Sequence, residues 1–184
     1  MPSLSAHYLP RPQAWFKALG FCGRIKHINE TPIHKSKACV VLSGIDCDDE
    51  EPVVLKLMID KESFEREKRA RVDLDLDDMF VVPIIFASDE CPERWEADAK
   101  NLAKKLTTKL DWPECPEYRH GIVMKQGERD LEVVALKERL GLSAIRDISR
   151  QVAHALVYLH SKNILHADIK PLASLSLLSS HITT

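Results

Sequence analysis

A short polar segment near the C-terminal end directly follows an apolar stretch that has helical periodicity. It reads His166-Ala-Asp168-Ile-Lys170-Pro171, so an imidazole, a carboxylate and an ammonium stand at alternate positions. Proton transfer and the binding of charged groups require side chains of these types. On residue types and spacing, the segment therefore looks like part of an active site.

This pattern resembles the catalytic loop of the protein kinases, which reads H-R-D-L-K-P-x-N. The match holds through Pro171, and with the order of the preceding elements the resemblance covers residues 24–171. It implies that Asp168 accepts the proton of a substrate hydroxyl and that Lys170 steadies the γ-phosphoryl group of ATP during transfer. His166 corresponds to the structural histidine of that loop, and the Lys-Pro pair favours Ser/Thr over Tyr as the substrate residue.

Two residues in the first half of the chain match the nucleotide-binding part of the same family. The run Val53-Val-Leu-Lys56 resembles the V-A-I-K motif, whose lysine contacts the α- and β-phosphates of ATP. Glu67 matches the helix glutamate that forms an ion pair with this lysine. Eleven residues separate the two positions, which leaves room for a turn and two helical turns that face the sheet. Each residue alone is common on a solvated surface, and their order ahead of the catalytic-loop pattern indicates the nucleotide site.

The segment after the last expected strand resembles the hinge that binds adenine. Met124 ends an apolar run and Lys125-Gln126-Gly127 follows it, so Met124 and Gln126 are expected to line the cofactor site. Asp130 stands where the family often has an acid that reaches the ribose, although a helix-starting aspartate explains it equally well. The resemblance thus implies ATP with Mg²⁺ as cofactor and a protein of unknown identity as substrate.

The match departs from the kinase pattern where phosphate and metal are bound. No glycine occurs between Gly23 and Gly44, so residues 29–36 are expected to cover the phosphates with their side chains present. Ala173 stands where the Mg²⁺-binding asparagine belongs, and the chain ends before any Asp-Phe-Gly. Because both usual metal ligands are absent, the rate of phosphoryl transfer is expected to fall by roughly 10⁴ or more.

Three functions stay open from the sequence. The first is an ATP-dependent Ser/Thr-type protein kinase, truncated just after the catalytic loop and impaired for that reason. The second is a non-catalytic, pseudokinase-like fragment that binds a nucleotide or a partner. The third is a mis-spliced product, because the composition changes abruptly to uncharged Ser and Leu over residues 172–184.

Apolar periodicity and turn residues predict the elements that carry these side chains. Antiparallel strands are expected at residues 24–28, 38–42, 52–58, 79–86 and 118–124, with an acidic turn at 43–51. Helices are expected at residues 61–71 with Asp60 as cap, at 92–110 as an amphipathic insert, at 131–140, and from a cap at Ser143 onward. The fold class is α+β and protein-kinase-like, with a five-stranded antiparallel N-lobe that carries one helix and the first helices of a truncated helical C-lobe.

The same pattern divides the chain into four parts. They are an irregular basic lead-in (1–23), a kinase-like N-lobe (24–127), a partial C-lobe ending in the catalytic loop (128–171) and a tail (172–184). The net charge of −2 gives no reason to expect nucleic acid or an anionic membrane as a partner, and no apolar run approaches the length of a membrane span. Without a secretory leader, a cytoplasmic location is expected.

The five cysteines favour reduced thiols over a disulfide framework, because their number is odd. Cys91 and Cys115 lie in a repeated Glu-Cys-Pro-Glu sequence that would suit a disulfide or a metal. A straight helix of about 18 residues between them would be roughly 27 Å long, however, which is too far for a disulfide. Two proline turns that flank a helix explain the repeat better.

Overall fold

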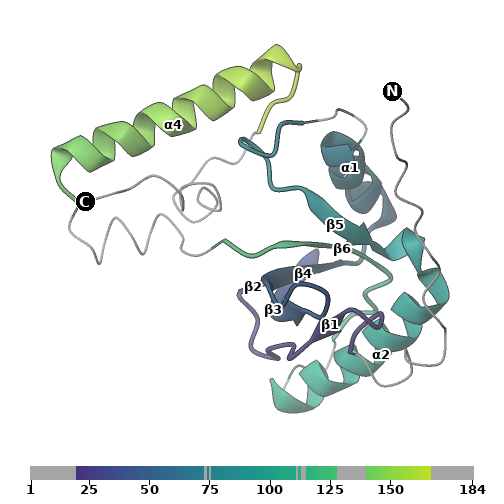
Figure 1. Cartoon of the computed structure of the whole chain (residues 1–184). Coiled ribbons are helices and arrows are strands. Elements are labelled where there is room, and N and C mark those ends of the chain that lie inside the picture. Colours follow the sequence, from purple (N-terminus) through teal and green to yellow (C-terminus); the bar gives the residue numbers. More distant parts are fainter. Residues whose placement is uncertain are drawn as a thin grey trace, which may run out of the picture.

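The computed structural model describes residues 20–72, 74, 76–110, 112, 115–127 and 140–166. In this part of the chain an antiparallel sheet lies between two helices, and a third, longer helix extends beyond the sheet (Figure 1). The expected α+β class is confirmed. Of the expected helix at residues 131–140, residues 131–139 lie outside the described residues.

The sheet has six strands in the order β1-β3-β4-β6-β5, with β2 also paired to β3. Their bounds are β1 Ile25–Lys26, β2 His34–Lys35, β3 Cys39–Asp46, β4 Pro52–Met58, β5 Ile84–Ala87 and β6 His120–Lys125. All neighbouring strands are antiparallel. The five expected strands are therefore present in the expected order. The sixth strand, β2, is additional to them.

β1 and β2 are two pieces of one interrupted strand along β3. Ile25 lies opposite Asp46 at one end of β3, and His34 lies opposite Val41 near the other end. The chain between them leaves the regular ladder, although the Asn29 backbone N–H still donates to the Ser43 carbonyl at 2.8 Å. The five-stranded prediction therefore counted one strand where the structure has two short ones.

Two strand boundaries differ from the prediction for physical reasons. β3 runs on to Asp46, so the first part of the expected acidic turn at residues 43–51 is sheet. β5 begins only at Ile84, because Pro83 has no backbone N–H to give to a ladder. The residues before it form a turn in which Phe80 and Val81 both donate to the Asp77 carbonyl. β5 is an edge strand and carries a bulge, the position that Pro83 indicated.

The described helices are α1 (Lys61–Val72), the short 3₁₀ helix η2 (Ser88–Glu90), α2 (Pro92–Lys109) and α4 (Leu142–Ser161). The expected cap of α1 is present, since the Ser63 N–H donates to the Asp60 carboxylate at 2.7 Å. The expected cap of α4 at Ser143 is wrong. Gly141 takes the cap position, in extended conformation, and its carbonyl accepts the Ile145 N–H.

The sheet buries a different set of residues on each face. On the outer face, alternate residues of β3, β4 and β6 pack against α2, whose Trp95, Ala99, Leu102 and Leu106 are all buried. On the other face, a smaller cluster of Met58, Phe64, Ala87, Ile122 and Met124 joins the sheet to α1. The expected insert at residues 92–110 is thus a helix that packs against the outer face of the sheet.

Gly121 of β6 is the position where α2 and the sheet approach most closely among the described glycines. A Cβ at this position would lie 2.4 Å from Trp95 Cζ2 and 2.5 Å from the backbone oxygen of Lys56. Gly121→Ala is therefore expected to destabilise the protein by about 1–3 kcal/mol, because backbone on the neighbouring strand has to move. Chemical denaturation measures this loss.

Gly141→Ala is the matched control, because an added Cβ there would have no heavy atom within 4 Å. Its free energy of unfolding is expected to stay within about 0.5 kcal/mol of the wild-type value. Equal effects of the two substitutions would contradict the close packing of α2 on β6.

α4 meets the rest of the described chain through Tyr158. Its hydroxyl accepts the Asp77 N–H at 2.7 Å, and its ring stacks on Phe80 with centroids 4.6 Å apart. Ile148 and Leu159 of this helix are buried, whereas Leu142, Ile145 and Val157 are exposed. Among the described residues, no helix has both the length and the apolar character to cross a membrane.

Candidate functional site

The face of the sheet that α1 adjoins, here called the site face, carries the residues singled out in the N-terminal half of the chain. Side chains alternate along a strand, so Val54, Lys56 and Met58 of β4 share one face. Lys56 lies opposite Val41 of β3 on one side and Ile122 of β6 on the other. The site face is half-buried around Lys56, whereas Val53, Leu55 and Leu57 are buried on the outer face beneath α2.

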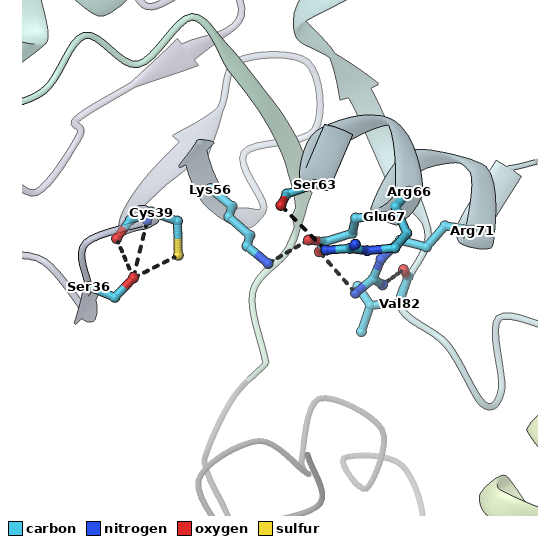
Figure 2. Close-up of polar contacts among 8 residues, drawn as sticks. All are labelled: Ser36, Cys39, Lys56, Ser63, Arg66, Glu67, Arg71 and Val82. Carbon is cyan, nitrogen blue, oxygen red and sulfur yellow. Dashed lines mark hydrogen bonds and ion pairs between the residues drawn. The ribbon is translucent and has the colours of Figure 1, made fainter. Parts of the chain in front are cut away.

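Lys56 and Glu67 form an ion pair across this face (Figure 2). Lys56 Nζ lies 2.6 Å from Glu67 Oε2, and the two side chains are 26% and 22% exposed. The other carboxylate oxygen, Oε1, lies 3.5 Å from Nη2 of Arg71, one helical turn later. Two cations therefore share one carboxylate, which leaves an excess positive charge at a partly buried place and suits the binding of an anion.

α1 is held where Glu67 can reach the sheet. Phe64, one turn before Glu67, is buried between α1 and β6 and stacks on His120 with ring centroids 5.4 Å apart. The remaining positions of α1 are mostly charged and face water, as the sequence indicated. The buried Phe64 and the Lys56–Glu67 ion pair therefore help to hold the helix on the site face, together with an ion pair of Lys68 with Asp89.

The Asp60 cap makes the stability of α1 depend on pH. Hydrogen bonds from the Ser63 side chain and then from its backbone N–H lower the pKa of the Asp60 carboxyl. A lowered folded-state pKa stabilises the fold above the unfolded-state pKa, and this stabilisation disappears as the pH falls through the folded-state pKa. Asp60→Ala is therefore expected to lower the melting temperature by about 2–5 °C at neutral pH, and by much less at a pH below the folded-state pKa of Asp60.

Asp60→Asn serves as the control, because its amide oxygen still accepts the Ser63 N–H but does not titrate in this range. Thermal melts from pH 2.5 to 7 compare the variants. A gap between wild type and Asp60→Ala that stays constant over this range would contradict the role of the ionised cap.

The turn that joins β2 to β3 occupies the place where the phosphate-covering loop was expected. The expected bounds of this loop, residues 29–36, are wrong, because His34 and Lys35 are already paired with β3. The connection is the short turn Ser36–Cys39, closed by the Ser36 N–H donating to the Cys39 carbonyl at 2.9 Å.

The Ser36 hydroxyl forms hydrogen bonds with the backbone of this turn, and Figure 2 shows its contacts with Cys39. Its oxygen accepts the N–H of Ala38 at 3.2 Å and that of Cys39 at 3.1 Å. A glycine-rich phosphate loop works by offering backbone N–H groups to the ligand. The N–H groups of Ala38 and Cys39 are already bonded within the protein, so this turn differs from such a loop in chemistry as well as in sequence.

The hinge residues lie at the end of β6. Met124 lies opposite Val54 of β4, on the site face, and is largely buried beside α1. The backbone N–H of Gln126 donates to the Pro52 carbonyl at 2.9 Å, so this donor already serves the sheet. Met124 is thus on the same face as Lys56, and Asp130 lies outside the described residues.

The catalytic-loop residues lie mostly outside the described part of the chain. His166 is described, is exposed, and follows α4 by a few residues, whereas Asp168 and Lys170 are outside. The structure therefore brings Lys56, Glu67 and Met124 to one face and leaves the relation of this face to the loop untested. Within the described residues, no group of three or more His, Cys, Asp or Glu side chains could hold a metal ion.

Sequence reasoning missed two residues of the site, Arg71 and Ser36. Arg71 could have been found from its spacing, because an arginine four residues after a helix glutamate faces it. Ser36 gave no such signal. Its role depends on the turn between β2 and β3, and the sequence did not indicate β2.

All five cysteines are free thiols in the structure.

Comparison with known proteins finds solved structures that resemble this chain in fold. No protein-family model and no curated protein matches the chain. Among the solved structures that match, the crystal structure of Rad53 1–466 in complex with AMP-PNP has a TM-score of 0.51 and 19% sequence identity. The match covers 82% of this chain and 34% of that one, so the chain spans about a third of the length of its neighbour.

This likeness shows the fold. The antiparallel sheet with α1 corresponds to a kinase-like N-lobe, and α4 corresponds to a helix of the C-lobe. The identity is too low to carry an activity, a substrate or a ligand from the neighbour to this chain. The expected kinase-like fold class is confirmed.

Proposed function

We propose that this protein binds ATP on the site face, with Lys56 contacting the phosphates. The Lys56–Glu67 ion pair carries the proposal, because it joins β4 to α1 in the arrangement that the kinase resemblance implies. A partly buried site with two cations and one carboxylate favours an anionic ligand. The structural neighbour, which is in complex with AMP-PNP, supports the same ligand class.

Within this proposal, adenine lies against Met124 and the segment around Gln126, and Asp130 reaches the ribose. Asp168 accepts the proton of a Ser or Thr hydroxyl on a protein substrate, and Lys170 steadies the γ-phosphoryl group. The proposed nucleotide lobe is residues 24–127 and the catalytic loop belongs to residues 128–171. We infer a cytoplasmic location for this activity.

A second candidate function is nucleotide binding without transfer, and the Ser36–Cys39 turn favours it. The N–H groups of Ala38 and Cys39 in this turn are already bonded to Ser36, so they give the β- and γ-phosphates less support than a glycine-rich loop does. Phosphoryl transfer depends almost wholly on positioning and charge neutralisation, so weaker support lowers the rate more than the affinity.

Thermal stabilisation by Mg·ATP tests the binding proposal. At a free concentration about 100 times Kd, a ligand stabilises the folded state by about 2.7 kcal/mol, which raises the melting temperature by several degrees. Lys56→Ala is expected to lose most of this shift. Lys104→Ala, an exposed lysine on α2, is the matched control and is expected to keep it. Absence of a shift at saturating Mg·ATP would contradict the proposal.

Transfer of radiolabelled phosphate separates the two candidates. If the chain transfers phosphate, the signal from purified protein is lost in Asp168→Asn. If the chain only binds nucleotide, wild type and Asp168→Asn give equal background signals while both are stabilised by ATP.

A further inference from the structure

Arg71 connects α1 to the segment that leads into β5, at the edge of the site face. It stands in the last turn of α1, and its Nη1 donates to the Val82 carbonyl at 2.7 Å, just before β5 (Figure 2). Its Nη2 lies 3.5 Å from Oε1 of Glu67, the oxygen that does not contact Lys56. The arginine therefore touches the partner of Lys56 from the opposite side and ties α1 to β5.

The planar guanidinium makes this double contact possible. Its two terminal nitrogens point in fixed directions, so one can meet a carbonyl while the other meets a carboxylate. The 3.5 Å separation is long for a hydrogen bond, so attraction between the charges accounts for most of the contact with Glu67. A glutamate four residues before a cation is also the favourable order on a helix.

The hydrogen bond from Arg71 to the Val82 carbonyl holds the C-terminal end of α1, which lies beyond the buried Phe64. Phe64 packs in the first half of the helix, whereas Arg71 contacts the Val82 carbonyl from the last turn. Val82 precedes Pro83, which has no N–H, and the regular ladder of β5 starts only after it. The Val82 carbonyl is thus an acceptor at the sheet edge, and Arg71 occupies it.

We propose that Arg71 is a positioning residue for the Lys56–Glu67 pair. It holds Glu67 toward Lys56 when no nucleotide is bound, and it keeps the carboxylate paired when phosphates draw Lys56 away. The second half of this statement rests on the proposed function, and the first half does not.

Acylation of lysines in the nucleotide-free protein tests the first half. An ammonium held against a carboxylate reacts slowly with an amine-directed acylating reagent, and mass spectrometry follows Lys56 relative to Lys104. Arg71→Met keeps the apolar stem and removes the charge, and it is expected to speed acylation of Lys56 about threefold or more. Unchanged acylation in Arg71→Met would overturn the proposal, because packing of the stem alone would then explain Arg71.

Two further variants complete the comparison. Arg66→Met removes the same charge from α1 at an exposed position that contacts Ser63, and it is expected to leave Lys56 unchanged. Arg71→Lys keeps a charge but cannot reach both partners, and an intermediate rate is expected. If Arg71→Met does not fold, Arg71→Gln, which also removes the charge beside Glu67, takes its place, and a wild-type rate in that variant overturns the proposal.

The affinities for ATP and adenosine test the second half. Positioning of Lys56 matters only for a ligand with phosphates, so Arg71→Met is expected to weaken ATP about threefold or more and leave adenosine unchanged. Equal weakening of both ligands would indicate a merely structural role. If wild type binds neither ligand, the proposed function fails, and the acylation result alone decides whether Arg71 positions Glu67.

Discussion

Replacing Trp95 by alanine is expected to lower the free energy of unfolding by about 3–5 kcal/mol. Trp95 is fully buried between α2 and the outer face of the sheet, where its ring meets Phe21 and Phe86 edge-on. Small domains are stable by only about 5–15 kcal/mol, so this single change brings the protein close to unfolding. Urea denaturation at 25 °C measures the loss.

Two variants separate packing from other effects of this change. The indole N–H of Trp95 has no hydrogen-bond partner among the described residues, so Trp95→Phe loses volume but no hydrogen bond and is expected to cost less than half as much. Lys104→Ala on the exposed side of α2 is expected to stay within about 0.5 kcal/mol of wild type. A loss below about 1 kcal/mol in Trp95→Ala would mean that α2 is an appendage and no part of the core.

Asp46→Ala is expected to cost about 2–4 kcal/mol, the second-largest effect. Asp46 is 1% exposed, and its two oxygens lie 2.9 and 3.2 Å from Nε of Arg24. One of them also accepts the Asp48 N–H at 2.9 Å, which holds the turn after β3. The substitution leaves both donors without their acceptor. Arg24 is about a third exposed, which keeps the cost below that of a fully buried pair.

Denaturation of two companion variants checks the cause of this loss. Asp46→Asn still offers an oxygen to the Asp48 N–H but has no charge for Arg24, so an intermediate loss is expected. Asp48→Ala removes a half-exposed carboxylate at 3.7 Å from the same arginine, and it is expected to change stability by less than about 0.5 kcal/mol. Equal effects of Asp46→Ala and Asp48→Ala would contradict the burial of Asp46.

Asp46 also shows why the strand boundaries could be predicted only in part. From the sequence it belongs to a run of acids that resembles a solvated turn, and nothing local distinguishes it from Asp48 and Asp49. Its burial depends on Arg24, which lies 22 residues earlier and reaches it only because β1 pairs with β3. A partner on another strand overrides the local preference for a turn.

Other elements could be predicted because their signals are local. β4 matches its expected range of 52–58, since an unbroken apolar run followed by Asp60 marks both the strand and the next cap. α2 matches within one residue, because Pro92 and the spacing of its apolar residues define it. The split of the first strand into β1 and β2 has no comparable signal in the sequence.

The candidate site, like the strand boundaries, could be predicted only in part from the sequence. Lys56 and Glu67 form the expected pair because their elements are regular and their separation fits a strand, a turn and a helix. The contacts of Arg71 and Ser36 depend on the positions of Val82 and of the β2–β3 turn, which lie beyond the reach of a local pattern. The assignments of Asp130, Asp168 and Lys170 stay predictions.

Titration of Mg·ATP into methyl-labelled protein, followed by NMR, tests the location of the nucleotide most directly. Val54 and Met58 lie on the site face, and Val53, Leu55 and Leu57 of the same strand lie on the outer face beneath α2. Saturable shifts are expected at Val54, Met58 and Met124, with little change at the other three. Shifts confined to the outer face, or none at saturating nucleotide, would contradict a nucleotide site at Lys56.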